Sequence, residues 1–98
     1  MMATTRFRVL DAMPAPHGGH ILRLRLQEGD PPSLSTLRRA RLRASGPDGG
    51  AAEAEVTGFA VFGGRPSADR LARSGRVDVH VEGEDAGAIG LQWNVEVA

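Results

Sequence analysis

The feature that most constrains this chain is a strict alternation of apolar and polar residues. In the clearest example, Leu22, Leu24 and Leu26 alternate with Arg23 and Arg25. Successive side chains of a β-strand point to opposite faces, so a period of two gives one face to a core and the other to water. The same period recurs in six segments, at residues 6–9, 21–27, 39–45, 52–57, 77–82 and 89–97. None of these segments repeats at the helical period, so the sequence predicts an all-β domain with antiparallel strands.

Glycine and proline mark the connections between the segments. Loops are predicted at residues 13–19 and 28–32, and a tight turn at 45–50, because each of these stretches combines Gly with Pro. Gly58 interrupts its segment and predicts a bulge. At most one short helical turn is predicted, near residues 67–74, with Ser67 as its cap and a glycine after its end.

A closed barrel is the architecture that suits six strands in 98 residues, because an open sheet would leave long edges exposed. An open two-sheet sandwich is the alternative. The chain is long enough for one domain, residues 1–98, and too short for two. Shared parity predicts one core, formed by Leu22, Leu24, Leu26, Leu42, Val56, Phe59, Val77, Val79, Val81, Leu91 and Trp93.

Composition excludes several classes of function. The chain has no cysteine, and its 12 basic and 12 acidic residues balance to a net charge of zero. It contains no phosphate-binding loop and no nucleophile with a matched base, so we expect a protein that is not an enzyme and needs no cofactor. His17, His20 and His80 lack the supporting ligands of a zinc site, so no metal is expected. Short apolar runs and a polar N-terminus predict a cytoplasmic protein without a membrane segment.

Arginines form the strongest surface feature. Arg23 and Arg25 lie on the polar face of one segment, and Arg39, Arg41 and Arg43 on that of another, and these five are the candidate binding residues. Guanidinium groups on adjacent strands could grip phosphates or an acidic protein surface. The alternative is that they only solvate the sheet and pair with Glu53 and Glu55 across the hairpin that the 45–50 turn closes.

Charge is also divided along the chain. Residues 1–45 carry eight arginines against three acidic residues, a net of +5, and residues 46–98 carry four against nine, a net of −5. Complementary pairing between neighbouring strands is the preferred explanation, and self-association of oppositely charged faces is the other.

Four stretches resemble the β-barrel second domain of translation GTPases of the elongation factor Tu type. His17–Gly29 is similar to its Gly-x-Gly-x-Val-x-x-Gly-x-Val-x-x-Gly stretch, with Gly19, Ile21, Leu26 and Gly29 at matching positions. Residues 55–62 resemble its Lys-Val-Thr-Gly-Ile-Glu-x-Phe strand, residues 67–75 its Asp-x-Ala-x-Ala-Gly turn, and residues 77–83 its Val-Gly-x-x-Leu-Arg-Gly stretch. Leu24 replaces an internal glycine of the family, and residues 30–37 lack its Val-Gly-Asp turn.

The resemblance implies a six-stranded closed barrel that serves as an interaction module, contacting RNA or a neighbouring protein domain. It does not include the family's nucleotide-binding domain, so it implies neither GTP binding nor GTP hydrolysis. We therefore expect a small non-catalytic module that binds a protein or RNA partner. The alternative is a structural or self-associating barrel, a homo-oligomer with no nucleic-acid role.

Overall fold

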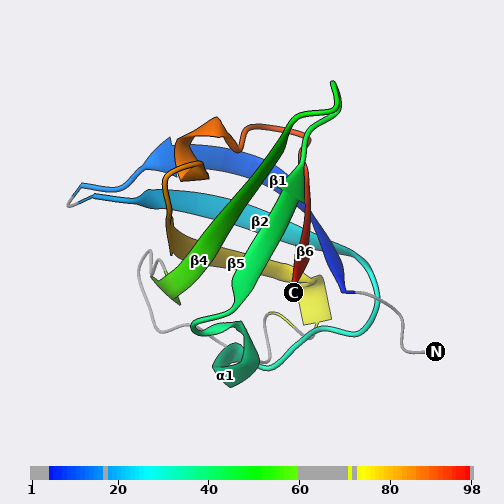
Figure 1. Ribbon diagram of the computed structural model, residues 1–98. Helices are drawn as coiled ribbons and strands as arrows, with labels where there is room; N and C mark the ends of the chain where they lie inside the picture. Colours follow the sequence, from blue (N-terminus) through cyan, green and yellow to red (C-terminus); the bar gives the residue numbers. More distant parts are fainter. Residues whose placement is uncertain (1–4, 17, 60–70, 72, 98) are drawn as a thin grey trace.

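The computed structural model describes residues 5–16, 18–59, 71 and 73–97. Its elements, in chain order, are β1 (Arg6–Pro14), β2 (His20–Glu28), α1 (Leu34–Leu37), β3 (Arg41–Ser45), β4 (Ala51–Phe59), β5 (Arg76–Glu82), the 3-10 helix η1 (Ala86–Ala88) and β6 (Asn94–Val97). All neighbouring strands are antiparallel, in the order β1-β2-β5-β4-β3-β6 (Figure 1). Since β6 also pairs with β1, the sheet closes on itself. The predicted six-stranded antiparallel barrel is confirmed.

The core lies inside this ring and follows the predicted parity. Six of the predicted residues are fully buried: Leu22, Leu24, Leu42, Val56, Val79 and Val81. Four others are partly buried and pack against them: Leu26, Phe59, Val77 and Trp93. The alternation therefore predicted correctly which face of β2, β3, β4 and β5 points inward. An error of one residue would have placed the whole apolar set of a strand on the outer face.

Leu91 is the exception, and its predicted burial is wrong. Its side chain is 58% exposed. The predicted strand over residues 89–97 is only four residues long, Asn94–Val97, because a turn precedes it. The Trp93 amide donates to the Gly90 carbonyl oxygen (3.3 Å), and Gln92 adopts a left-handed φ of 69°. This turn breaks the alternation, which leaves Leu91 in solvent while Trp93 stays against the core.

The first strand is longer than its alternation indicates. β1 reaches Pro14, inside the predicted loop, because a register shift between Val9 and Asp11 inserts an extra residue, Leu10. A bulge of this kind disrupts the period of two without ending the pairing with β2. The bulge predicted at Gly58 is confirmed by the register shift between Val56 and Gly58 in the pairing of β4 with β5.

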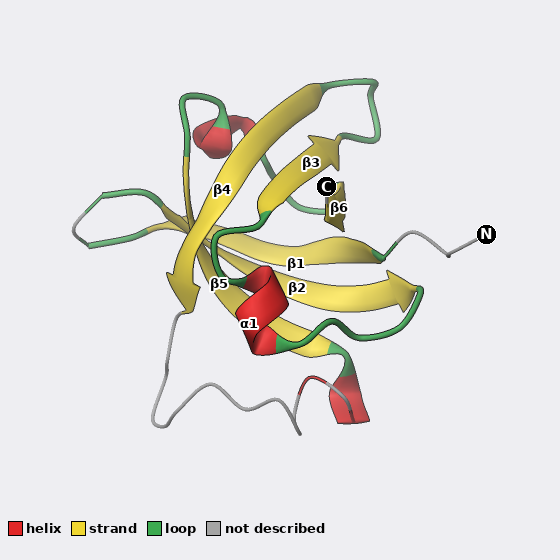
Figure 2. Ribbon diagram, turned by 60° about the horizontal axis from the view of Figure 1, so that its bottom comes forward, coloured by secondary structure: helices red, strands yellow, loops and turns green. Residues whose placement is uncertain are grey.

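Two short helices lie outside the predicted strands, and neither was expected. In α1, which lies at one end of the barrel (Figure 2), the Ser33 hydroxyl accepts a hydrogen bond from the Thr36 amide (3.1 Å), and Leu37 is fully buried. The other is η1. Most of the turn predicted near 67–74 lies outside the described residues, but Leu71 is helical and buried, and the Gly75 amide donates to its carbonyl oxygen (2.8 Å). None of the described helices is long and apolar enough to cross a membrane.

Candidate anion-binding surface

The five predicted arginines do not form one surface. Arg23 and Arg25 lie on β2, and Arg41 and Arg43 lie on β3. In the ring, two other strands separate β2 from β3 in either direction. Arg39 does not belong to β3 at all: it precedes the strand with a left-handed φ of 68°, which ends its expected alternation with the other two.

Three of the five arginines form ion pairs with neighbouring strands. Arg23 Nε lies 3.3 Å from Asp78 Oδ1, Arg41 Nη1 lies 3.2 Å from Glu53 Oε2, and Arg43 Nε lies 3.9 Å from Glu53 Oε1. Glu53 therefore pairs with both arginines of β3, whereas Glu55, the other predicted partner, forms no ion pair with a described residue although it lies opposite Arg41. Arg41 and Arg43 fit the alternative interpretation, in which they solvate the sheet and pair across it.

Arg25 has no such partner and stands between two other arginines. The strand register places it directly opposite Arg8 on β1 and opposite Arg76 on β5. All three side chains are exposed on the outer face of the sheet, and none forms an ion pair with a described residue. We call these three residues the arginine row. Adjacent strands lie about 4.8 Å apart, so the row spans about 10 Å.

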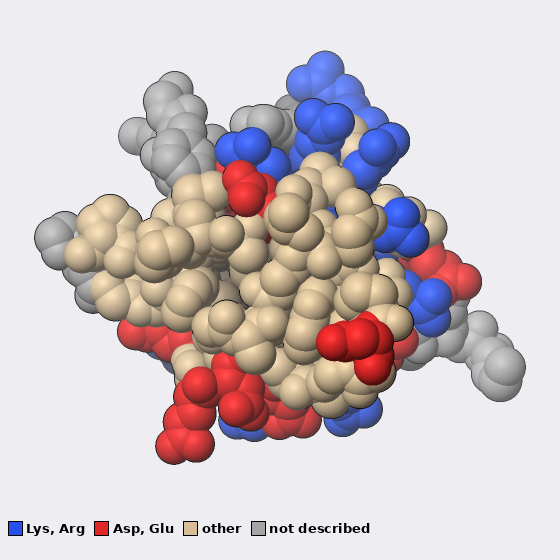
Figure 3. Space-filling model, turned by 90° about the horizontal axis from the view of Figure 1, so that it is seen from above, with Lys and Arg blue, Asp and Glu red and all other residues tan. Residues whose placement is uncertain are grey.

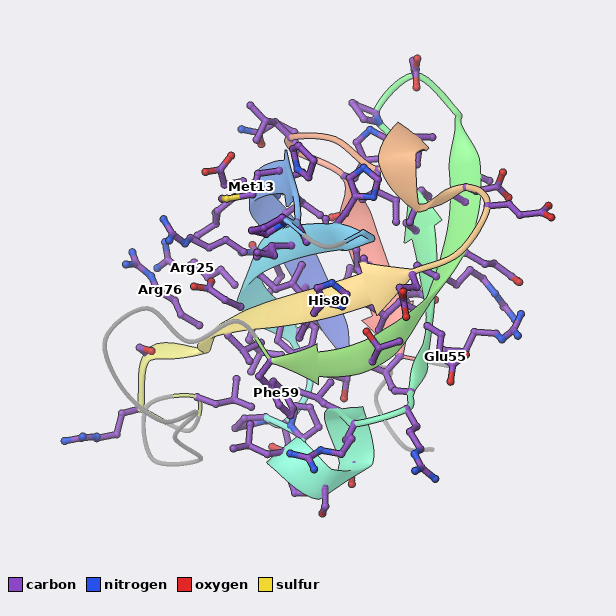
Figure 4. All side chains as sticks on the ribbon, turned by 90° about the vertical axis from the view of Figure 1, so that its left-hand side faces the viewer. Met13, Arg25, Glu55, Phe59, Arg76 and His80 are labelled. Carbon is purple, nitrogen blue, oxygen red and sulfur yellow. The ribbon has the colours of Figure 1, made fainter. Side chains whose placement is uncertain are left out.

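The rows on either side of the arginine row are neutralised. On one side, Arg6 Nη2 lies 3.4 Å from Glu28 Oε2 and 3.6 Å from Glu96 Oε1. On the other, Arg23 pairs with Asp78 and lies opposite Asp11 in the register. Like charges directly opposite each other destabilise a sheet, and opposite charges stabilise it. The arginine row therefore lowers the stability of the sheet, whereas the ion pairs on either side of it raise it. Figure 4 shows Arg25 and Arg76 projecting side by side from β2 and β5.

Negative charge gathers at the opposite end of β5. Glu55 on β4 lies opposite Glu82 on β5, and the exposed Glu84 and Asp85 follow in the next loop. With Arg41 and Glu53 these four line an open hollow of about 290 Å³. We call Glu55, Glu82, Glu84 and Asp85 the acidic rim. Seen from above, most basic side chains gather along the upper right edge of the view and most acidic ones along the lower edge, although each edge also carries some charges of the other sign (Figure 3).

Of the three histidines, His80 has a structural role that its hydrogen bonds show. His80 Nε2 donates to the Gly18 carbonyl oxygen (2.9 Å), and its Nδ1 lies 2.6 Å from Thr57 Oγ1, so the ring joins the β1–β2 connection to β4. His20 Nδ1 is buried without a hydrogen bond, and His17 lies outside the described residues. Within the described part of the chain, no three histidine or acidic side chains gather as ligands for a metal ion.

Sequence reasoning found Arg25 and missed its two neighbours. Arg8 and Arg76 have the outward parity of their strands, but only the register shows that both face Arg25. No signal in the sequence selects them, because none of the five candidate arginines has an acidic residue two positions away on its own segment. No protein-family model, no curated protein and no solved structure matches the chain. The resemblance to the translation barrel therefore stays a prediction.

Proposed function

We propose that this chain is a non-catalytic interaction module of the translation-factor barrel type, and that it binds RNA through the arginine row. The observation that supports the proposal is that the arginine row lacks carboxylate partners, whereas the charged side chains on either side of it are paired. Arg6 and Arg23 have carboxylate partners, whereas Arg8, Arg25 and Arg76 have none among the described residues. Three guanidinium groups in a line favour a ligand that supplies several anionic oxygens.

RNA is the partner that best suits this surface. Phosphates occur at regular intervals along its backbone, and a row about 10 Å long can contact more than one of them. The described aromatic side chains, Phe7, Phe59 and Trp93, are buried or packed against the core, so contacts to phosphate rather than base stacking would supply the affinity. Such a module would bind weakly and with little sequence preference. A cytoplasmic location belongs to the same proposal.

The test is a titration of a fluorescent oligouridylate of about 15 nucleotides at low salt, a length near the upper end of single-strand site sizes for one small barrel. Three phosphate contacts predict that log Kd rises with log salt at a slope of about 2. The double variant Arg25→Gln/Arg76→Gln should reduce binding below detection. Arg41→Gln/Arg43→Gln is the matched control, because it removes the same charge from arginines that already pair with Glu53.

Two results would contradict the proposal. One is no association of the unmodified protein at about 100 μM, which corresponds to about −5.5 kcal/mol. A module without affinity for RNA would leave a protein as the partner. The other is an equal loss of binding in both double variants, because it would show that net charge, and not the arginine row, attracts the RNA.

A further inference from the structure

Two leucines have side chains that are exposed to solvent and contribute little to the core. Leu10 is 38% exposed and Leu91 is 58% exposed, and they are the two large apolar side chains that the described residues leave in solvent. Leu10 is the extra residue of the β1 bulge, and Leu91 lies in the turn before β6. Backbone hydrogen bonds join these segments: the Gln92 amide donates to the Val9 carbonyl oxygen (3.1 Å) and the Val9 amide to the Trp93 carbonyl oxygen (2.9 Å).

Local propensity opposes the turn that presents Leu91. The turn runs from Gly90 to Trp93, and its third residue, Gln92, adopts a left-handed φ of 69° that glycine or asparagine would adopt more easily. Strain of this kind persists where the surrounding structure holds it, and it gathers at functional surfaces. The strained turn and the bulge thus present two exposed leucines on segments that hydrogen bonds join, and an apolar surface of this kind can contact a partner.

Charges of opposite sign on the two sides of this face indicate what kind of partner would fit it. Figure 3 looks down on the region of this turn and of the β1–β2 hairpin, and a broad uncharged area separates the basic edge from the acidic edge. Arg8 precedes Leu10 by two residues on β1, on the side of the arginine row. Glu84 and Asp85 precede η1, which leads into the turn of Leu91. The uncharged area is thus flanked by opposite charges.

We propose that this face, which we call the Leu10–Leu91 face, binds a second copy of the same chain to form a two-fold symmetric dimer. A two-fold axis that lies in the interface, perpendicular to the line from the basic edge to the acidic edge, brings each basic edge over the partner's acidic edge. It also places the uncharged area of one copy against that of the other. An isologous contact of this kind closes at two subunits. A standard interface takes about 800 Å² from each partner, about an eighth of the 6191 Å² surface of the chain.

Sedimentation equilibrium between about 10 and 500 μM tests the dimer, over the range of concentrations in which a weak association becomes visible. The unmodified protein should change from monomer to dimer over this range. Leu91→Asp should weaken association about tenfold or more and leave the melting temperature unchanged, because Leu91 contributes little to the core. The control, Ser35→Asp, adds the same charge to the exposed surface of α1 and should dimerise normally.

A charge exchange tests the orientation of the two copies. Arg8→Glu and Glu84→Arg should each weaken the dimer, and the double variant should recover it, because the two edges are then reversed together. A protein that stays monomeric at 500 μM, assemblies larger than a dimer, or a double variant weaker than both single ones would overturn the proposal. The RNA titration is separate below about 10 μM protein, where the chain is monomeric and no partner covers Arg8. There Leu91→Asp should bind the oligouridylate like the unmodified protein, so either proposal can fail without the other.

Discussion

Replacing Arg25 with glutamine should stabilise the fold, although the change removes an exposed charge and creates no new contact. Arg25 lies directly opposite Arg8 and Arg76, with no carboxylate partner among the described residues. Glutamine keeps most of the aliphatic stem and a hydrogen-bonding head, so the main effect is the loss of two repulsive neighbours. Such a gain identifies a residue that the fold tolerates and does not require.

The size of the effect follows from Coulomb's law. Two unit charges about 7 Å apart in a water-like dielectric repel by about 0.6 kcal/mol, and screening at physiological ionic strength reduces this to about 0.25 kcal/mol. Two such neighbours give a gain of about 0.5 kcal/mol at 0.15 M salt and about 0.9 kcal/mol at 0.01 M. For a domain of this size, 0.5 kcal/mol raises the melting temperature by about 2–4 °C.

Thermal unfolding followed by circular dichroism at both salt concentrations measures this gain. Arg23→Gln is the matched control, since it removes the same charge two residues away on the same strand. Because Arg23 pairs with Asp78, its loss should instead destabilise the protein by about 0.2–1 kcal/mol. A lower melting temperature for Arg25→Gln, or a gain that does not shrink as salt rises, would refute the reasoning from the arginine row.

Two further predictions concern how the barrel is packed and joined. A Cβ at Gly46 would lie 2.7 Å from Trp93 Cε2, so Gly46→Ala should lower stability by about 1–3 kcal/mol. Gly58→Ala has open space at the same point and should be neutral or stabilising by up to about 1 kcal/mol; equal melting temperatures for the two variants would be inconsistent with the contact. His80→Ala removes the hydrogen bonds to the Gly18 carbonyl and to Thr57 Oγ1 and should cost about 1–3 kcal/mol. In His80→Ala, backbone amide hydrogen exchange should become faster mainly near the β1–β2 turn. A uniform increase over the whole barrel would contradict a local structural role for His80.

The alternation of residues determined the fold class and most of the core by itself. Leu22, Leu24, Val79 and Val81 are buried because a period of two assigns each strand one inward face, whatever its partners are. The β3–β4 hairpin was equally local, since a short turn between two such segments brings Arg43 opposite Glu53. Closure of the sheet followed from the need to leave no edge strand exposed.

Tertiary structure decided where the pattern breaks and which charges meet. Leu91 has the parity of a core residue, but the turn at Gln92 rotates it into solvent while Trp93 packs over a glycine of the β3–β4 turn. The arginine row is likewise absent from any single segment. Arg25 lies 17 positions after Arg8 and 51 before Arg76 in the sequence, and only the register of three strands places them side by side. The face to which a side chain points is a local property of the strand, whereas register and strand order depend on long-range packing. The sequence could therefore indicate which arginines lie on the surface but not which of them are neighbours.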